Sequence, residues 1–357
     1  MKKKHITIRQ AAPGMVAGED IFAYNDQLII TEGTVLTDKI ITRLKFYSIS
    51  DFSIILEEPK NPEIKDISYT QLIRESEEFK QFNTTFIESL QNFTGDLDEI
   101  AGDDKPLDIS GLLDHTAQIL SKSRNGIHVL DMMHCMREND DVTYVHSINV
   151  SLICNVFGHW LKLPEKDIEV LTLSGLLHDI GKLTIPPEII NKQDTLTESE
   201  FLTIKAHTVS GYQLLKDKDL DLRVKYAALM HHERCDGSGY PNGFTSHQID
   251  SFAKIVAIAD VYDAMTSARV YRPALCPFEA ISVFEAEGLQ KFDPQYIMIF
   301  LGEIVQSYVG KRVRLSNKSI GEVRMINKNY LSKPIVQVGS SFIDLSKEHD
   351  LFIEAII

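Results

Sequence analysis

The sequence predicts a mainly α-helical protein with a small α/β module near its N-terminus and a small β module near its C-terminus. Two observations predict this fold class. Apolar residues recur at helical spacing over most of residues 109–308. Residues 309–357 instead hold short apolar runs separated by glycine, asparagine and proline, a pattern typical of short antiparallel strands.

Residues 1–60 are expected to form the small N-terminal α/β module, to which we assign a regulatory role. Its apolar runs are short and are broken at Gly18. Thr37 is placed to cap a short helix, and residues 52–56 read as a strand.

The next segment, residues 61–108, is more polar and predicts a helical linker region. Its apolar positions place helices near residues 68–92, and the run Gly102-Asp103-Asp104-Lys105-Pro106 predicts a loop.

The central residues 109–308 predict one helical domain. Residues Ile168–Leu177 are nearly all apolar, so this helix should be buried on most sides. Helices are also expected over 252–264 and 296–305. Residues 232–247 contain three glycines and a proline, which predicts a loop.

Composition limits the possible functions. The 357 residues include 51 acidic and 37 basic side chains, giving a net charge of −14. This balance argues against a nucleic-acid polymer as partner, because such binding depends on many phosphate contacts. No run of about 18 apolar residues occurs, so no membrane span is expected. We also expect no signal peptide. The four cysteines form no Cys-x-x-Cys pair, and free thiols are typical of a cytoplasmic protein.

The chemistry is concentrated in seven side chains of the central domain. One buried histidine is more often a satisfied core residue than a ligand. However, the pair His178-Asp179 ends a strongly apolar helix, where unpartnered polar groups would be costly. A metal resolves this cost, because it needs nitrogen and oxygen donors that converge in a dry pocket. The candidate ligands are His146, His178, Asp179, His207, His231, His232 and Asp260.

Five histidines and two aspartates suffice for two metal ions that share one bridging carboxylate. Imidazole and carboxylate ligands suit iron, manganese or zinc, and the lack of cysteine ligands disfavours a structural zinc site. Two ions about 3.5–4 Å apart can hold a bridging hydroxide and clamp a phosphoryl oxygen. The set therefore predicts hydrolysis of a phosphate ester by in-line attack.

Two motifs make a family resemblance specific. His178-Asp179 is followed by Gly181-Lys182, and residues 231–241 read His-His-Glu-Arg-Cys-Asp-Gly-Ser-Gly-Tyr-Pro. With further segments at 259–267 and 271–273, this pattern resembles the HD-GYP subgroup of the HD superfamily of metal-dependent phosphohydrolases. The resemblance covers about residues 125–305 and implies a helical HD-type phosphohydrolase domain within 109–308. Residues 6–56 and 310–357 look like modules that often flank such domains.

The resemblance implies a phosphodiesterase that hydrolyses cyclic di-GMP, a bacterial second messenger, to linear pGpG or GMP. Some members act instead on 3′,3′-cyclic GMP-AMP. It implies two divalent ions, with iron or manganese favoured, and a bridging role for Asp179. One ion should be held by His146, His178, Asp179 and Asp260. The other should be held by Asp179, His207, His231 and His232.

The resemblance also assigns substrate contacts. Lys182 should contact the scissile phosphate, although a lysine there can also cap the preceding helix. Arg272 is the expected second phosphate contact, and Asp263 should orient a metal ligand. Arg234 and Asp236 either contact substrate or pair with each other to hold the loop. The loop residues expected to shape the pocket are Gly237, Gly239, Tyr240 and Pro241.

One departure from the family bears on the product. Some members carry a glutamate four residues before the histidine that corresponds to His146, and it supports a third metal. Here that position is Val142, which cannot ligate. The adjacent Asp141 should point elsewhere, because one residue turns a helix by about 100°. We therefore expect a two-metal site and inefficient conversion of pGpG to GMP.

Other interpretations remain open from the sequence alone. The chain could be a cyclic di-GMP-binding sensor with little turnover, or a phosphodiesterase that prefers 3′,3′-cyclic GMP-AMP. A hydrolase of nucleoside phosphates or alarmones is a third possibility, against which the Gly-Tyr-Pro loop argues. The apolar helix faces near 68–92 and 109–135 raise the hypothesis of a homodimer.

Overall fold

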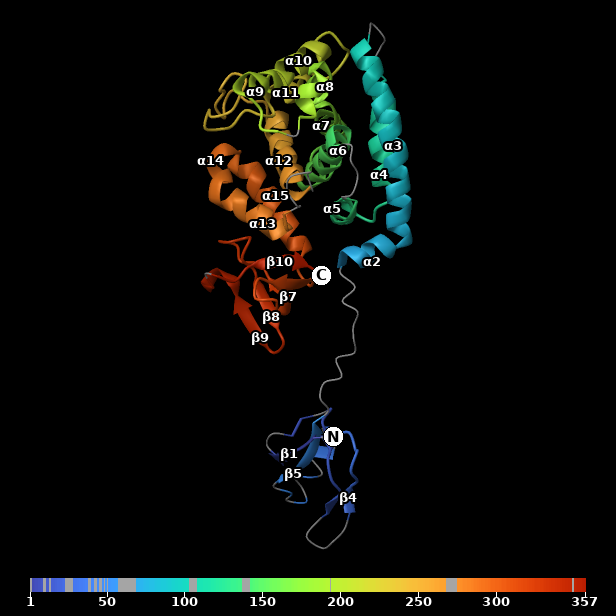
Figure 1. Cartoon of the computed structure of the whole chain (residues 1–357), viewed down its shortest axis with the longest axis vertical. Helices are drawn as coiled ribbons and strands as arrows, with labels where there is room; N and C mark the ends of the chain where they lie inside the picture. The colour runs from blue at the N-terminus through green and yellow to red at the C-terminus, as the bar shows by residue number, and fades with distance from the viewer. Residues whose placement is uncertain are drawn as a thin grey trace. The chain divides into compact units, whose positions relative to one another are not determined.

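The computed structural model of the chain describes residues 2–8, 11–12, 14–22, 28–37, 40–41, 44, 47, 49, 51–56, 69–102, 108–136, 142–192, 194–267, 275–348 and 350–357. The chain divides into two compact units, Met1–Asp66 and Ile67–Ile357, and each is described by itself (Figure 1). The predicted divisions near 108 and 308 lie inside the second unit, because one hydrophobic core runs from its first helices to its last strand. The finer division into four segments stays a prediction.

The described strands of the N-terminal unit are short and antiparallel. They are β1 (Lys2–Thr7), β2 (Val16–Ala17), β3 (Ile21–Phe22), β4 (Leu28–Ile30) and β5 (Asp51–Leu56). One sheet has the order β1-β5-β2, and β3 pairs with β4 in a second sheet. Ile6 lies opposite Phe52, and both side chains enter the core of this unit. The Thr37 hydroxyl accepts a hydrogen bond from the Ile40 amide at 3.3 Å, as a capping residue does.

The second unit is mainly helical, which confirms the predicted fold class. Its α-helices are α2 (Tyr69–Glu75), α3 (Glu77–Gly102), α4 (Ile109–Leu120), α5 (Gly126–Cys135), α6 (Val142–Trp160), α7 (Glu165–Leu177), α8 (Pro187–Ile190), α9 (Glu198–Lys205), α10 (His207–Leu215), α11 (Leu222–Met230), α12 (Ser251–Thr266), α13 (Pro277–Val283), α14 (Leu289–Lys291) and α15 (Pro294–Ser307). A 3₁₀ turn, η2 (Ile180–Thr184), and a π turn, η3 (Phe284–Gly288), connect helices, and a second 3₁₀ turn, η4 (Leu345–Lys347), lies among the C-terminal strands.

Helices α6, α7, α11 and α12 pack against one another at the centre of this unit. Every residue of α7 from Leu171 to Leu177 is buried, as the nearly continuous apolar run predicts. Helix α12 is likewise buried over residues 255–260. Polar side chains at the ends of these helices therefore lie inside the protein and need partners there.

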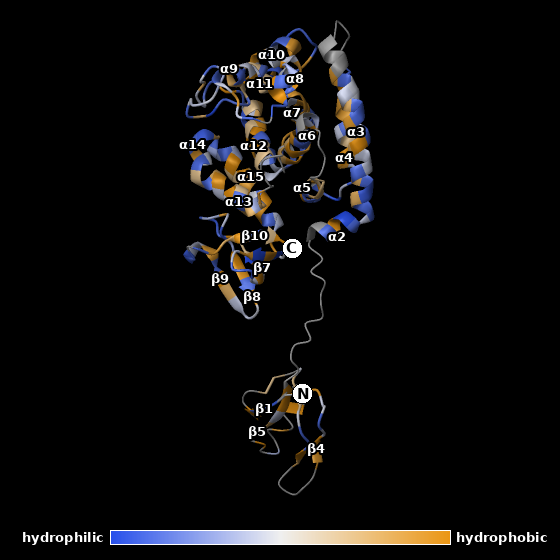
Figure 2. Cartoon of the chain, in the orientation of Figure 1, coloured by the Kyte–Doolittle hydropathy of each residue, from blue (hydrophilic) through white to orange (hydrophobic). Residues whose placement is uncertain are grey.

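Helix α3 runs beside α4 and also contacts α6 (Figure 1). Figure 2 shows hydrophilic and hydrophobic residues interspersed along α3, as expected of a helix with one buried face. Its buried side chains include Phe82, Phe86, Phe93 and Leu97, spaced four or seven residues apart. Helix formation thus continues beyond the predicted end near residue 92, because the apolar stripe continues. This apolar face of α3 packs against other parts of the same chain. It therefore gives no support to the predicted homodimer, which stays a hypothesis.

The C-terminal strands form a five-stranded antiparallel sheet. They are β6 (Arg312–Leu315), β7 (Ile320–Met325), β8 (Ile335–Val338), β9 (Ser341–Asp344) and β10 (Ile353–Ile356), in the order β10-β6-β7-β8-β9. Val313, Val323 and Val336 point into the shared core, which agrees with the predicted period of two. None of the helices in the described parts of the chain has the length and apolar character needed to cross a membrane.

Candidate metal centre

The pair His178-Asp179 lies at the buried end of α7. Helix α7 ends at Leu177, His178 is its C-cap, and η2 begins at Ile180. His178 is 0% exposed and Asp179 is 3% exposed. Gly181 permits the close approach of η2 to α10, since a Cβ atom at this position would collide with the backbone oxygen of His207. The turn after the pair thus brings His207 to Asp179.

The other predicted ligands come from four further helices. His146 lies on α6, His207 is the first residue of α10, and Asp260 lies on α12. His231 is the C-cap of α11, and His232 follows it. All of these side chains except His232 are buried, and His232 is half-buried. The structure therefore brings all seven predicted residues to one place.

The seven side chains form two groups that could each hold a metal ion. His146, His178 and Asp260 make one group, in which the potential ligand atoms lie within 4.8 Å of one another. The same limit holds for the second group. Its members are Asp179, His207, His231 and His232.

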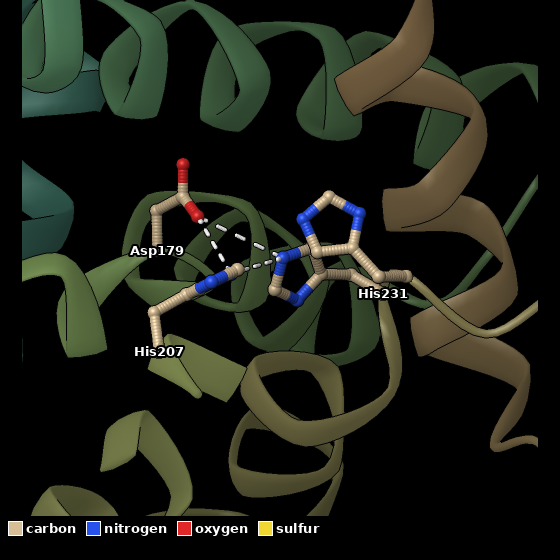
Figure 3. A group of neighbouring side chains, drawn as sticks. Asp179, His207 and His231 are labelled. Carbon is tan, nitrogen blue, oxygen red and sulfur yellow. Dashed lines mark hydrogen bonds and ion pairs between the residues drawn. The ribbon is translucent and has the colours of Figure 1, made fainter. Parts of the chain in front are cut away.

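The carboxylate of Asp179 lies between the two groups. Its Oδ1 is 3.3 Å from Nε2 of His207 and 3.7 Å from Nε2 of His231, and both contacts are drawn in Figure 3. Its Oδ2 is 3.3 Å from Nε2 of His178 and 3.8 Å from Nε2 of His146. One oxygen therefore faces each group, which is the arrangement a bridging carboxylate requires.

Backbone carbonyls fix the orientation of three imidazoles. Nδ1 of His178 donates to the Gly175 oxygen at 2.7 Å. Nδ1 of His207 and Nδ1 of His231 donate to the carbonyls of Ile204 and Ala227, at 2.6 and 3.0 Å. A donor role for Nδ1 leaves the Nε2 lone pair of each ring free to bind a metal.

A carboxylate fixes the fourth imidazole. Nδ1 of His146 lies 2.7 Å from Oδ2 of Asp263, while its Nε2 lies 3.0 Å from Oδ1 of Asp260. The other oxygen of Asp263 accepts from Nδ2 of Asn149 at 3.0 Å and from the Ser267 hydroxyl at 2.9 Å. The geometry is that expected of Asp263 as a residue that orients a ligand.

The protonation states of His231, His232 and Asp179 favour cation binding. Burial lowers the pKa of His232 to about 3 and holds the pKa of His231 well below its usual range. Burial opposes ionisation of Asp179, but the charge of Lys182 together with the contacts to His178 and His207 outweighs it and keeps the pKa of Asp179 well below its usual range. Burial also disfavours a charge on His146, yet its hydrogen bonds to Asp260 and Asp263 raise its pKa to about 9. A metal there would displace a proton from His146.

Two buried atoms in the cluster have no hydrogen-bond partner among the described residues, namely Nε2 of His178 and Oδ1 of Asp179. Leaving such groups unpaired costs free energy. Both atoms face other potential ligands, so a bound cation would satisfy them. The donor set of imidazoles and carboxylates therefore fits divalent ions.

Lys182 forms an ion pair with Asp179, the residue predicted to bridge the two metal ions. Its Nζ lies 2.5 Å from Oδ2 of Asp179, so its ammonium pairs with that carboxylate rather than with a carbonyl at the end of α7. The side chain is about one quarter exposed. It is thus placed beside the cluster, where it can meet an incoming anion.

The glycine-rich loop after His232 is held from inside by Glu233. This buried carboxylate accepts the backbone N–H of Asn242 at 2.7 Å and that of Phe244 at 2.9 Å. The Tyr240 ring stacks on the imidazole of His232, with centroids 4.6 Å apart. A Cβ atom at Gly239 would collide with the backbone of residues 232–234. The loop therefore folds back over a predicted metal ligand.

Arg234 and Asp236 have separate partners. Nη1 of Arg234 donates to the carbonyls of His231 and Glu233, and its guanidinium lies over the Phe292 ring. Asp236 accepts from the backbone N–H and hydroxyl of Ser238. The two side chains thus hold the loop separately, and the ion pair between them that the sequence left open does not form.

Two supporting residues were not identified from the sequence. Asn149 lies three residues after His146, a spacing that places both on one helix face and could have indicated it. Glu233 lies inside the quoted motif, but its role depends on the loop returning to it. Among the predicted residues, Arg272 and Asp141 lie outside the described residues, as does the side chain of Val142.

The part of the chain that carries this site is similar to known proteins. The HD domain family matches residues 115–296. Cyclic di-GMP phosphodiesterase PA4108 of Pseudomonas aeruginosa is 37% identical over 204 residues, which cover 57% of this chain and 49% of that protein. The cyclic di-GMP phosphodiesterase response regulator RpfG of Xanthomonas campestris pv. campestris is 37% identical over 150 residues, covering 42% and 40%. The 3′3′-cGAMP-specific phosphodiesterase 1 of Vibrio cholerae is 36% identical over 179 residues, covering 50% and 41%.

The matched segments span about half or less of the length of these relatives. Among solved structures, Bd1817, an HDG"Y"P protein from Bdellovibrio bacteriovorus, superposes with a TM-score of 0.52 at 19% identity. That superposition covers 85% of this chain and all of the other, and it supports the fold alone. Since the family match extends over half of the sequence and includes every predicted metal ligand, the chain belongs to the HD domain family.

Proposed function

We propose that this chain is a metal-dependent phosphodiesterase of the HD-GYP type that hydrolyses cyclic di-GMP to pGpG. The observation that carries the proposal is the position of Asp179, whose two carboxylate oxygens face two groups of histidine ligands. The names of the relatives from Pseudomonas aeruginosa and Xanthomonas campestris support cyclic di-GMP as the substrate.

The proposed centre holds two divalent ions. One is assigned to His146, His178, Asp179 and Asp260, and the other to Asp179, His207, His231 and His232. When bound, the ions would supply an activated water and neutralise charge on a phosphoryl oxygen. Iron or manganese is proposed because imidazole with carboxylate is a ligand set that suits both.

The chain's own side chains orient the ligands and the substrate. Asp263 and the backbone carbonyls hold the imidazoles with Nε2 turned inward. Lys182 lies at the edge of the cluster and is assigned to the scissile phosphate, where its charge would stabilise the negative charge of the transition state. Arg272 is assigned to the second phosphate. Tyr240 and the loop around it are assigned to the wall of the substrate site.

The expected product is pGpG, because Val142 supplies no ligand for a third ion. Further hydrolysis to GMP should therefore be slow. We place the activity in the bacterial cytoplasm, which agrees with four cysteines that form no disulfide.

A second candidate substrate is 3′,3′-cyclic GMP-AMP. The Vibrio cholerae relative named for this substrate is 36% identical, close to the 37% of the relatives named for cyclic di-GMP. A binding sensor without turnover is the alternative from another class. The complete set of seven ligands argues against it.

The experiment uses the full chain, purified anaerobically and loaded with iron or manganese. Cyclic di-GMP and 3′,3′-cyclic GMP-AMP are each incubated with it, and the products are separated by chromatography. The proposal predicts pGpG and a higher kcat/KM for cyclic di-GMP, with no product from Asp179→Ala. A higher kcat/KM for the hybrid dinucleotide would reassign the substrate. Binding without product in the metal-loaded protein would favour the sensor.

A further inference from the structure

A cavity of about 380 Å³ lies beside the metal centre proposed above. It is bounded by α3, α6, α8 and residues 176–185. Asp179 and Lys182 form part of its wall, so the cavity opens onto the position assigned to the scissile phosphate. Its volume is in the range of small-molecule sites in proteins. The chemistry assigned to the metal centre leaves the rest of this cavity without a role.

Several of the other lining residues have apolar side chains. Leu97 of α3, Leu183 of η2 and Ile190 of α8 contribute aliphatic surface. Tyr144, two residues before His146 on α6, adds an aromatic ring. Aliphatic and aromatic side chains together favour a ligand with flat apolar faces, because those faces lose their contact with water when they pack against the wall.

The cavity wall also carries a hydroxyl, that of Ser147. Ser147 is 4% exposed and lines the cavity, and its side chain has no hydrogen-bond partner among the described residues. A ligand atom in the cavity could donate to this hydroxyl or accept from it. The amide side chain of Asn191, which caps α8, likewise lines the cavity without a partner in the described chain. It can both donate and accept.

We propose that this cavity binds the purine nucleoside joined to the phosphate at Asp179 and Lys182. This inference rests on the proposed function, which places a phosphodiester at those two residues. A purine has apolar faces for Leu97 and Tyr144, and hydrogen-bonding edges for Ser147 and Asn191. A nucleoside attached to that phosphate would have to occupy adjacent space, and the cavity supplies it.

The wall from α3 has a consequence for specificity. Leu97 lies outside residues 115–296, the part of the chain that matches the HD domain family. It is 4% exposed and belongs to the apolar stripe that packs α3 onto the helical body. Nucleoside recognition would therefore depend on a helix that precedes the family's domain.

The test measures the dissociation constants of GMP and inorganic phosphate by calorimetry on the metal-loaded full chain. Inorganic phosphate lacks a nucleoside and serves as the reference ligand. Ser147→Ala removes an unpaired hydroxyl and should therefore leave the fold intact. It should weaken GMP relative to phosphate by about three- to tenfold, as expected for one lost hydrogen bond. Leu97→Trp, which fills the cavity, should weaken GMP relative to phosphate by about tenfold or more.

Ile87→Trp is the matched control, because Ile87 lies on the exposed face of the same helix. It should bind both ligands as the wild type does. The inference is overturned if Ser147→Ala binds GMP as tightly as the wild type, or if the wild type binds GMP no better than phosphate. Turnover of cyclic di-GMP by the wild type is measured separately. If the wild type does not hydrolyse cyclic di-GMP, the proposed function is refuted. The GMP measurement then still tests the nucleoside site independently.

Discussion

The carboxylate of Asp263 lies 2.7 Å from Nδ1 of His146 and holds that imidazole with Nε2 directed at Asp260, 3.0 Å away. Both aspartates lie on α12, about one helical turn apart, whereas His146 lies on α6. A single helix thus supplies a potential metal ligand and the group that orients a second one. This contact makes the packing of α12 against α6 part of the site.

Replacing Asp263 by asparagine should weaken metal binding at the group that contains His146. The amide keeps the shape but removes the charge that fixes the imidazole, and loss of such an outer partner costs about 10- to 100-fold in metal affinity. Competition with a chelator measures the affinity. Asp217→Asn is the control, since the Asp217 side chain is 88% exposed. Equal affinity in the two variants would show that Asp263 does not orient His146.

Single ligand changes should remove different numbers of ions. His207→Ala affects one group only, so about one metal per chain should remain in a site built for two. Asp179→Ala removes the carboxylate shared by both groups and should reduce the metal content further. Elemental analysis of anaerobically purified protein gives the counts. Two metals per chain in Asp179→Ala would refute the bridging assignment.

Lys182→Ala should keep the metal and lose rate. Its ammonium lies at the edge of the cluster, and removal of one charge-stabilising donor at a transition state costs about 10²- to 10³-fold in kcat. Metal content and cyclic di-GMP turnover are measured on the same sample, with Lys166→Ala, an exposed change on α7, as control. Unchanged turnover would limit Lys182 to its pairing with Asp179.

Glu233→Gln should destabilise the protein by about 1–3 kcal/mol, because a glutamine can accept only one of the two backbone N–H bonds from the loop. Urea unfolding of the metal-free proteins measures this difference. Glu303→Gln, an exposed change on α15, should have almost no effect. Equal unfolding midpoints for the two variants would show that Glu233 does not hold the loop.

Local sequence signals predicted much of the site. The apolar run before His178 indicated a buried helix end, and the structure places His178 and Asp179 there. The motif around His231 predicted both a helix end and a loop. These features depend on residues that are close together in the chain, so they can be predicted from local composition and spacing.

Features that depend on tertiary packing were not predicted. The separate partners of Arg234 and Asp236 arise because the loop folds back onto residues 231–233. The contribution of Leu97 to a cavity beside Asp179 requires α3 to pack along α6, which no local pattern specifies. Helix α3 also continues past its predicted end, because Phe93 and Leu97 extend its buried face.

Turnover of cyclic di-GMP as a function of metal added tests the central claim most directly. The metal-free full chain is titrated anaerobically with iron or manganese, and pGpG formation is followed by chromatography. The account predicts no product without metal and a rate that rises until about two ions are bound per chain. A metal-saturated protein that binds cyclic di-GMP and leaves it intact would contradict the account.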